Sequence, residues 1–296
     1  MLILSEDDVR RLLRMEDLIP AMAGALADLS SKKAVQPVRM VLPVVDHKGF
    51  FGAMPAYNGA LGAKLVTFYP ENVGVHTHHA LIVLFRPETG EPISVMDGRL
   101  ITEMRTAAVS AAGAKLLARE DASVMAILGS GVQAGSHLEA IRLVRDISEV
   151  RIWSPRNSRA FAEQYDIVAA DSVEDAVRNA DIVVVATSAQ APVLTGKWLS
   201  PGTHVAAIGA NRPTWRELDD VLLAAASIFV ECRESATVES GDVIAAGHIE
   251  AEIGEVISGL RPGRRSDDEI TLFKTLGAAV EDLAAAELVY RRAMAP

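Results

Sequence analysis

The sequence contains very little cysteine, few aromatic residues and no long apolar run. Its one cysteine, Cys232, excludes an intramolecular disulfide and is typical of a reducing compartment. No apolar run approaches the roughly 18 residues that a membrane-spanning helix needs, and the acidic segment Met1–Asp8 lacks the pattern of a signal peptide. We therefore expect a soluble, cytoplasmic protein with no membrane partner.

Positive charge is also scarce. The 29 Lys and Arg residues are outnumbered by 39 Asp and Glu residues, which leaves a formal net charge of −10 at pH 7. This balance favours solubility and argues against a nucleic-acid partner, which would need a basic surface. The motifs G-x-S-x-G, H-E-x-x-H, C-x-x-C and the P-loop are absent, so hydrolase, metalloprotease, thiol-redox and NTPase functions lack support.

The composition instead fits an α/β fold. Half of the 296 residues are hydrophobic, while aromatic residues make up only 5%. A mixture dominated by Ala, Val, Leu and Ile suits parallel sheets packed by helices. The length is sufficient for two domains.

The first hundred residues combine two helices with a series of strands. Ser5 followed by three acidic residues predicts a helix N-cap, and a second helix is expected from Glu16 to about Ser31. Short β-rich runs then follow one another without intervening helices, at Val38–Leu42, Phe50–Met54, Ala63–Phe68, Leu81–Phe85 and Pro92–Met96, the last two forming a hairpin. This order predicts an antiparallel or mixed sheet in an α+β domain.

After Asp121 the pattern changes to alternating strands and helices. Buried strands are expected at Ser123–Leu128, Glu149–Trp153, Ile182–Ala186, His204–Ile208 and Ser227–Val230. This alternation predicts a doubly wound parallel sheet of the Rossmann type. A helix from Leu100 to about Arg119 connects the two parts, and a last helix, Ile270–Ala293, could return to the first domain. The predicted Rossmann domain is 112–278, and the discontinuous α+β domain is 1–111 plus 279–296.

The strongest local motif is a glycine loop at Ala126–Ala134. An apolar strand is followed by G-x-G-x-x-A and then by a helical pattern. Gly129 permits a sharp turn, Gly131 lets the backbone approach a pyrophosphate, and Ala134 allows close packing of helix and strand. In this context the motif predicts dinucleotide binding, with a structural turn as the alternative.

The end of the next strand indicates which dinucleotide is bound. NAD enzymes often place an acid there for the ribose 2′-hydroxyl, but this sequence has Ser154-Pro155-Arg156 and no acid. Arg156 could pair with a 2′-phosphate. NADPH is therefore the preferred cofactor and NADH the second possibility, unless these arginines only form a solvated loop.

Several segments together resemble the ornithine cyclodeaminase/mu-crystallin family. They follow one another along almost the whole chain: Lys64–Phe68, Val95–Gly98, Arg105–Ala111, the glycine loop with Gln133, Ile208–Pro213, Arg216–Leu218, Ile253–Val256 and Thr271–Gly277. The resemblance implies a Rossmann domain for the dinucleotide, and a second domain for substrate binding and homodimer formation. It also implies an NAD(P)-dependent oxidoreductase acting on C=N or CH–NH bonds.

The resemblance places Arg39, Lys64 and Arg105 around a substrate carboxylate, with Lys64 and Arg105 also counted as catalytic. Basic side chains suit this role because a 2-imino acid carries one fixed negative charge. The alternative for each residue is an ordinary exposed charge. Asn211 and Gly277 complete the expected substrate contacts.

The resemblance also supplies the expected cofactor contacts, most of which lie on loops at the strand ends. They are His78, Arg105, Thr106, Gly129, Ser130, Gly131, Val132, Gln133, Ser154, Arg156, Thr187, Ser188, Ala189, Gly209, Ala210 and Lys274. We expect no metal, since the cluster His76-Thr77-His78-His79 has no further ligands at regular spacing. The resemblance places His78 and His79 near the nicotinamide or substrate, and His79 is the candidate proton donor.

One departure from the family pattern bears on the reaction. Ornithine cyclodeaminases carry an aspartate where Asn211 stands, and an amide cannot act as a carboxylate base. We therefore expect reduction of a 2-imino carboxylate to an L-amino acid, as in mu-crystallin-like ketimine reductases. Expected substrates include pyrroline-2-carboxylate, piperideine-2-carboxylate, iminosuccinate or pyruvate with an amine. The alternatives are a cyclodeaminating lyase with catalytic NAD and a non-catalytic NADPH-binding protein.

Overall fold

The computed structural model describes residues 1–295, which divide into two compact units. Unit 1 consists of Met1–Arg105 and the chain from Gly277 onward, and unit 2 is Thr106–Leu276. Helix α3 (Arg99–Leu117) passes from one unit to the other. No helix in residues 1–295 is both long and apolar enough to cross a bilayer. The domain roles inferred from the sequence remain predictions.

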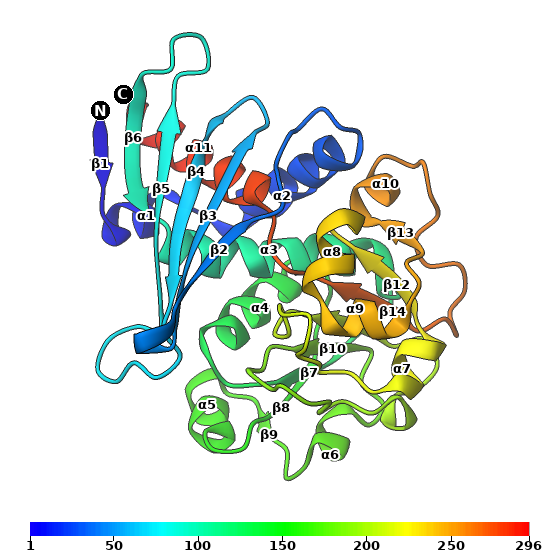
Figure 1. Cartoon of the computed structure of the whole chain (residues 1–296). Helices are drawn as coiled ribbons and strands as arrows, with labels where there is room; N and C mark the ends of the chain where they lie inside the picture. The colour runs from blue at the N-terminus through cyan, green and yellow to red at the C-terminus, as the bar shows by residue number, and fades with distance from the viewer. Residues whose placement is uncertain (296) are drawn as a thin grey trace. The chain divides into compact units, whose positions relative to one another are not determined.

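Unit 1 is built on a six-stranded mixed sheet (Figure 1). The strand order is β1-β6-β5-β4-β3-β2, and only the β1–β6 pair is parallel. The strands are β1 (Leu2–Leu4), β2 (Met40–Val44), β3 (Gly49–Tyr57), β4 (Leu61–Phe68), β5 (His78–Phe85) and β6 (Pro92–Asp97), with a short 3₁₀ turn at Val45–His47. The predicted β5–β6 hairpin is confirmed, whereas the sequence analysis missed β1.

Three helices accompany this sheet: α1 (Glu6–Leu12), α2 (Met15–Ser30) and α11 (Ala279–Met294). The predicted cap of α1 is present, since the Ser5 hydroxyl accepts from the Asp8 N–H while the Asp8 carboxylate accepts from the Ser5 N–H. Helix α11 packs against α2 and against β3, β4 and β5. Because strand side chains alternate in direction, one face of the sheet is buried under α11 and the other stays open.

Unit 2 contains an eight-stranded sheet in which every described pair is parallel. The order is β13-β12-β14-β11-β10-β7-β8-β9. The strands are β7 (Val124–Leu128), β8 (Glu149–Trp153), β9 (Val168–Ala169), β10 (Ile182–Val185), β11 (His204–Ala207), β12 (Ser227–Val230), β13 (Ala251–Glu252) and β14 (Thr271–Lys274). Five of them match the predicted strands closely, and the predicted α/β fold class is confirmed.

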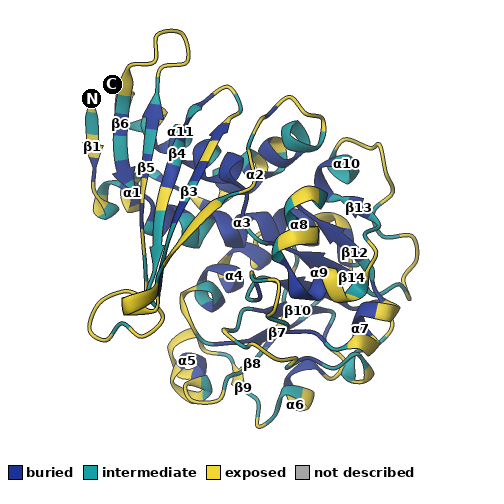
Figure 2. Cartoon of the chain, viewed as in Figure 1, coloured by how far each residue is buried: buried dark blue, intermediate teal, exposed yellow. Residues whose placement is uncertain are grey.

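Short helices connect these strands. They are α4 (Val132–Arg142), α5 (Ser158–Tyr165), α6 (Val173–Val177), α7 (Asp220–Ala225), α8 (Arg233–Glu239), α9 (Gly241–Ala246) and α10 (Ile253–Ile257), with a 3₁₀ turn at Gly196–Trp198. The central strands are buried on both faces, whereas β2 in unit 1 is largely exposed (Figure 2). Continuous apolar strands are what a parallel sheet covered by helices requires.

The prediction of one helix over Ile270–Ala293 is wrong. Its first part is strand β14, which pairs with β11 and β12 inside the parallel sheet, and helix α11 begins only at Ala279. Gly277 separates the two elements with a φ of +83°, a conformation that favours glycine. Periodicity cannot distinguish a short buried strand from a helical segment, which explains the error.

Candidate active site

The glycine loop lies between β7 and α4, as the motif predicts. Gly129 has a φ of +110°, and a Cβ there would stand 2.2 Å from the carbonyl oxygen of Ala186. Gly131 is the N-cap of α4 and is exposed, and outside its own neighbours no heavy atom of the described chain lies within 4 Å of where its Cβ would be. The loop therefore gives a phosphate open access to a helix N-terminus.

Two further observations describe the surroundings of this loop. The side-chain oxygen of Gln133 is buried and has no hydrogen-bond partner within residues 1–295. The Ser130 hydroxyl lies 2.9 Å from the Ser154 hydroxyl, which ties the glycine loop to the end of β8. Arg156 is exposed two residues further along, and Ser154 also accepts from the backbone N–H of Asn157.

The remaining loop residues lie at the same edge of the sheet. Thr187, Ser188 and Ala189 follow β10, and Gly209, Ala210 and Asn211 follow β11. The carboxyl ends of neighbouring parallel strands form one edge, where ligands of this fold bind. Asn211 is exposed, whereas Thr106, in the part of α3 that belongs to unit 2, is buried.

Lys274, at the end of β14, has a different environment from the other predicted cofactor contacts. Its side chain is only 1% exposed, and its ammonium donates to the carbonyl of Ala207 at 3.3 Å. Burial lowers the pKa of Lys274, and the negative charges of Glu217, Asp242 and Glu231 oppose that effect. Lys274 thus lies within a group of buried acids, none of which the sequence analysis selected as site residues.

In unit 1, two of the predicted basic residues form a buried charge cluster with two acids. The Lys64 ammonium on β4 lies 2.6 Å from Asp282 Oδ2. The Arg105 guanidinium lies 2.9 Å from Asp282 Oδ1 and 2.8 Å from Glu281 Oε2. All four side chains are at most 5% exposed. We call Lys64, Arg105, Glu281 and Asp282 the unit 1 cluster.

Arg39 belongs to the same neighbourhood. Its guanidinium donates to the carbonyl of Gly277 at 2.9 Å. Burial lowers the pKa of Lys64 to about 8, and repulsion from Arg105 and Arg39 adds to that shift while Asp282 opposes it. Burial alone would raise the pKa of Asp282, but Arg105 and Lys64 outweigh it and hold that pKa below its usual range. The three predicted basic residues are therefore close neighbours.

The two histidines of the predicted site lie on opposite faces of β5. Lys64 pairs with Ile82 across the β4–β5 ladder, so His78 shares the buried face with Lys64. Burial lowers the pKa of His78 to about 4, and the charges of Lys64 and Arg105 contribute. His79 is exposed on the open face, where its ring lies 6.1 Å from that of His76. Within residues 1–295, no group of three or more His, Cys, Asp or Glu side chains could hold a metal ion.

The acids that complete both groups are not among the site residues predicted from the sequence. Glu281 and Asp282 stand in the apolar run Ala278-Ala279-Val280-Glu281-Asp282-Leu283, and a pair of acids on an otherwise apolar helix start is the signal that could have revealed them. Glu217 belongs to the family-like segment Arg216–Leu218 but is not among the predicted site residues. Its burial depends on how the chain folds back after β11, which a local pattern cannot show.

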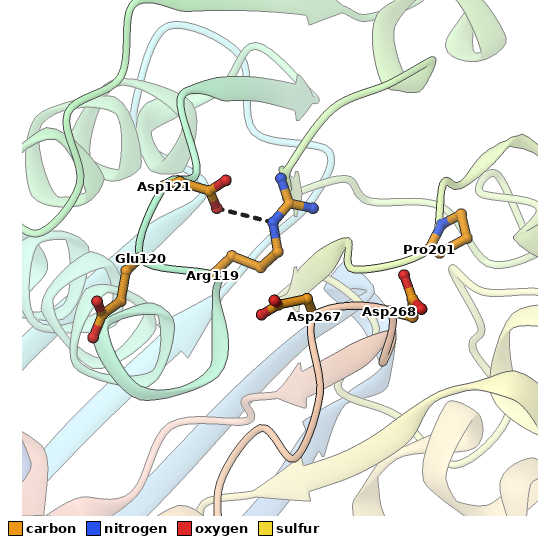
Figure 3. Close-up of a pocket in the computed structure, with 6 residues that line it drawn as sticks. All are labelled: Arg119, Glu120, Asp121, Pro201, Asp267 and Asp268. Atoms are coloured by element: carbon orange, nitrogen blue, oxygen red, sulfur yellow. Dashed lines mark hydrogen bonds and ion pairs between the residues drawn. The ribbon is translucent and has the colours of Figure 1, made fainter.

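A separate pocket lies at the amino ends of the parallel strands, away from the carboxyl-end loops described above (Figure 3). It encloses about 420 Å³ and is lined by Arg119, Glu120, Asp121, Pro201, Asp267 and Asp268. These residues precede β7, β11 and β14. Arg119 is held there by Asp121 at 3.0 Å and by Asp181 at 2.6 Å. The pocket therefore lies at the amino ends of the strands and takes no part in the candidate site.

Comparison with known proteins identifies the family. The family model described as "Ornithine cyclodeaminase/mu-crystallin family" matches residues 1–296. The chain belongs to this family. The ketimine reductase mu-crystallin of Mus musculus is 47% identical over 301 residues, which cover 97% of this chain and 96% of the relative. The family expected from the sequence is confirmed.

Solved structures agree with this assignment. The Δ(1)-pyrroline-2-carboxylate reductase of Thermococcus litoralis, in complex with NADH and L-proline, is 37% identical, with a TM-score of 0.94 over 99% of this chain and 98% of that one. An archaeal alanine dehydrogenase dimer with bound NAD is 38% identical, also with a TM-score of 0.94, over 99% of this chain and 96% of that one. The names of these relatives agree with the expected NAD(P)-dependent oxidoreductase acting on C=N or CH–NH bonds.

Proposed function

We propose that this chain reduces 2-imino carboxylates to L-amino acids with NAD(P)H. The observation that carries the proposal is the grouping of Arg39, Lys64 and Arg105 in one unit, with Lys64 and Arg105 buried beside Asp282. A 2-imino carboxylate carries one fixed negative charge, which such a group of cations can hold in one orientation. The proposed reaction requires a bound dinucleotide, and the glycine loop of unit 2 supports that part of the proposal.

In this proposal each group of residues has a defined task. When bound, the nicotinamide supplies the hydride. Gly129, Gly131 and the first turn of α4 hold the phosphates, and the cations of unit 1 hold and orient the substrate carboxylate. The imine nitrogen must be protonated to accept a hydride, so an acid or a water has to supply that proton. His79 remains the candidate of the sequence analysis for this step, although it is exposed on the open face of the sheet.

We propose NADPH as the preferred cofactor. Arg156 is exposed just beyond β8, and the Ser154 hydroxyl beside it contacts the glycine loop. The segment 153–159 contains no acid that would favour the ribose 2′-hydroxyl of NAD. A guanidinium in this place suits a 2′-phosphate.

We further propose that the protein acts in the cytoplasm as a homodimer formed through unit 1. The open face of the mixed sheet carries exposed apolar side chains from four strands: Ile3, Met40, Leu42, Leu65 and Leu81. Exposed apolar patches of this kind commonly mark protein interfaces. The archaeal alanine dehydrogenase with the same fold is a dimer.

A substrate screen tests the proposal. Oxidation of NADPH and NADH is followed with pyrroline-2-carboxylate, piperideine-2-carboxylate, iminosuccinate, and pyruvate with ammonia or methylamine. We expect imine-dependent oxidation of the dinucleotide and formation of an L-amino acid. Release of ammonia from ornithine with tightly bound NAD would instead establish a cyclodeaminase, the activity that Asn211 argues against. Dinucleotide binding without turnover on any substrate would indicate a binding protein.

A further inference from the structure

Glu217 is a buried carboxylate that joins the two loops after β10 and β11. One oxygen accepts from the backbone N–H of Thr187 at 3.0 Å and from its hydroxyl at 2.6 Å. The other accepts from the backbone N–H groups of Gly209 at 2.7 Å and Ala210 at 2.8 Å. The side chain is completely buried. Four donors from two separate loops thus converge on one carboxylate.

The backbone of Glu217 is held as firmly as its side chain. Its carbonyl accepts from the N–H groups of Val193 and Leu194, further along the loop after β10. Its own N–H and that of Leu218 donate to Asp242, which is also buried. The backbone of Glu217 is therefore fixed by hydrogen bonds. Its carboxylate in turn fixes the positions of both loops through the four hydrogen bonds described above.

Only the ionised form of Glu217 can accept from all four donors. Burial raises the pKa of Glu217 above its usual range, and the positive charge of Lys274 and the hydrogen bonds from Thr187 and Ala210 oppose that rise. A neutral carboxylic acid has an O–H, and an amide an NH₂, in place of one accepting oxygen. That donor would face an N–H donor of one of the two loops and could not bond to it. Charge and shape are thus both needed at this position.

Gly209 shows how closely the loops approach each other. A Cβ on Gly209 would stand 2.1 Å from the carbonyl oxygen of Thr187 and 2.3 Å from Glu217 Oε1. No larger residue fits without moving one of the loops. The spacing between the loops is therefore set by direct contact with the Glu217 carboxylate.

We propose that Glu217 is a positioning residue for the dinucleotide, which sets the spacing of the loops that carry Thr187, Gly209 and Ala210. The inference rests on the proposed function, because these three residues are expected cofactor contacts. Glu217 itself touches the loops and not the reacting atoms. Losing it should weaken dinucleotide binding even when the chain remains folded.

The test measures the Kd of NADPH and NADH by fluorescence in the absence of substrate, for the full chain and its Glu217→Gln variant. Glutamine keeps the shape but turns a donor toward one loop. Because hydrogen bonds to charged groups are worth more than neutral ones, we expect the Kd to rise at least about tenfold. The backbone amides of Thr187, Gly209 and Ala210 should also exchange hydrogen faster, while amides of the β7 strand remain protected.

Glu231→Gln is the matched control, because Glu231 is another buried acid beside Lys274 and accepts from the N–H group of Leu276, which lies outside both loops. It removes the same charge from the same group of buried acids but keeps a side-chain oxygen for the N–H group of Leu276, so the Kd should change less than about twofold. Should Glu217→Gln not fold, Glu217→Asp takes its place, because a shortened carboxylate keeps the charge but cannot reach both loops. We expect the same rise in Kd.

The outcomes separate this inference from the proposed function. If the unmodified chain binds neither dinucleotide, the proposed function fails. If it binds one and the Glu217 variant binds it equally well, the positioning role is wrong even when the variant is less stable. If Glu231→Gln weakens binding as much as Glu217→Gln does, the effect belongs to the charge of the acids around Lys274 and the positioning role is again wrong.

Discussion

The two units bury their charges in different ways. In unit 1, Lys64 and Arg105 share the carboxylate of Asp282, and side chains satisfy one another. In unit 2, Glu217 and Asp242 accept mainly from backbone N–H groups, and the positive charge of Lys274 lies near them while its ammonium donates to the carbonyl of Ala207. The ion pairs of unit 1 hold side chains in place, whereas the carboxylates of unit 2 hold backbone loops in place.

This difference bears on what each group can do. Asp282 already fixes the positions of Lys64 and Arg105, so a substrate carboxylate would meet cations that are oriented in advance. Carboxylates held by backbone N–H groups have no capacity left for a ligand and instead fix the positions of loops. The unit 1 cluster is therefore suited to binding the substrate, and the acids of unit 2 are suited to shaping the site.

The largest expected effect comes from Asp282→Asn, which breaks the unit 1 cluster. The variant replaces the carboxylate of Lys64 by a neutral amide, while Arg105 keeps its ion pair with Glu281, and losing one partner of a buried ion pair typically costs about 3–5 kcal/mol. We expect a loss of this size in the free energy of unfolding, measured with urea. Glu287→Gln on the same helix is the control, because its partner Arg291 is 71% exposed and the pair contributes at most about 0.5 kcal/mol. Equal losses in the two variants would contradict the assignment.

A second prediction concerns pH and Lys64. The ammonium must be charged to hold a carboxylate, and the pKa of Lys64 is about 8, so kcat/KM for the imino acid should fall about tenfold per pH unit above that value. Since the ordinary pKa is 10.5, the unfolded chain binds more protons between pH 8 and 10.5, and the contribution of Lys64 to stability rises with pH across that window.

Lys64→Arg distinguishes the source of this pH dependence. A guanidinium stays protonated throughout the range, so the decline of kcat/KM above pH 8 should move to higher pH in the variant. If the decline stays in place, it belongs to another group, such as the imine itself, and Lys64 is not the titrating residue.

The smallest expected effect concerns an exposed charge in unit 2. Arg156→Ala should weaken NADPH binding by about threefold to tenfold and leave NADH binding unchanged, because only NADPH carries the 2′-phosphate and the site is solvated. Arg178→Ala, which removes an exposed arginine paired with Glu174, serves as the control. Equal weakening of both cofactors would show that Arg156 does not contact the 2′-phosphate.

Much of the fold could be predicted because its signals are local. The glycine loop, the Ser5 cap and five strands of unit 2 each depend on a few consecutive residues, and the structure contains all of them. The signals for β9, β13 and β14 were too short or too ambiguous. Strand β14 has only four residues, and its neighbours β11 and β12 come from earlier parts of the chain.

Only part of the candidate site could be predicted, because only part of it has a local signal in the sequence. Basic residues and strand-end loops could be selected from motifs and from the family resemblance. Their acidic partners could not, since 177 positions separate Arg105 from Asp282 and 30 separate Thr187 from Glu217. The resemblance also could not reveal that Lys274 is buried among acids.

By itself, the sequence determined the Rossmann class, the family and the presence of a dinucleotide loop, because glycine spacing and apolar runs act through neighbouring residues. Only the tertiary structure decided which carboxylates complete the two charged groups. A buried charge must find its partner wherever the fold places one, and Asp282 and Glu217 acquire their roles from contacts that no short segment contains.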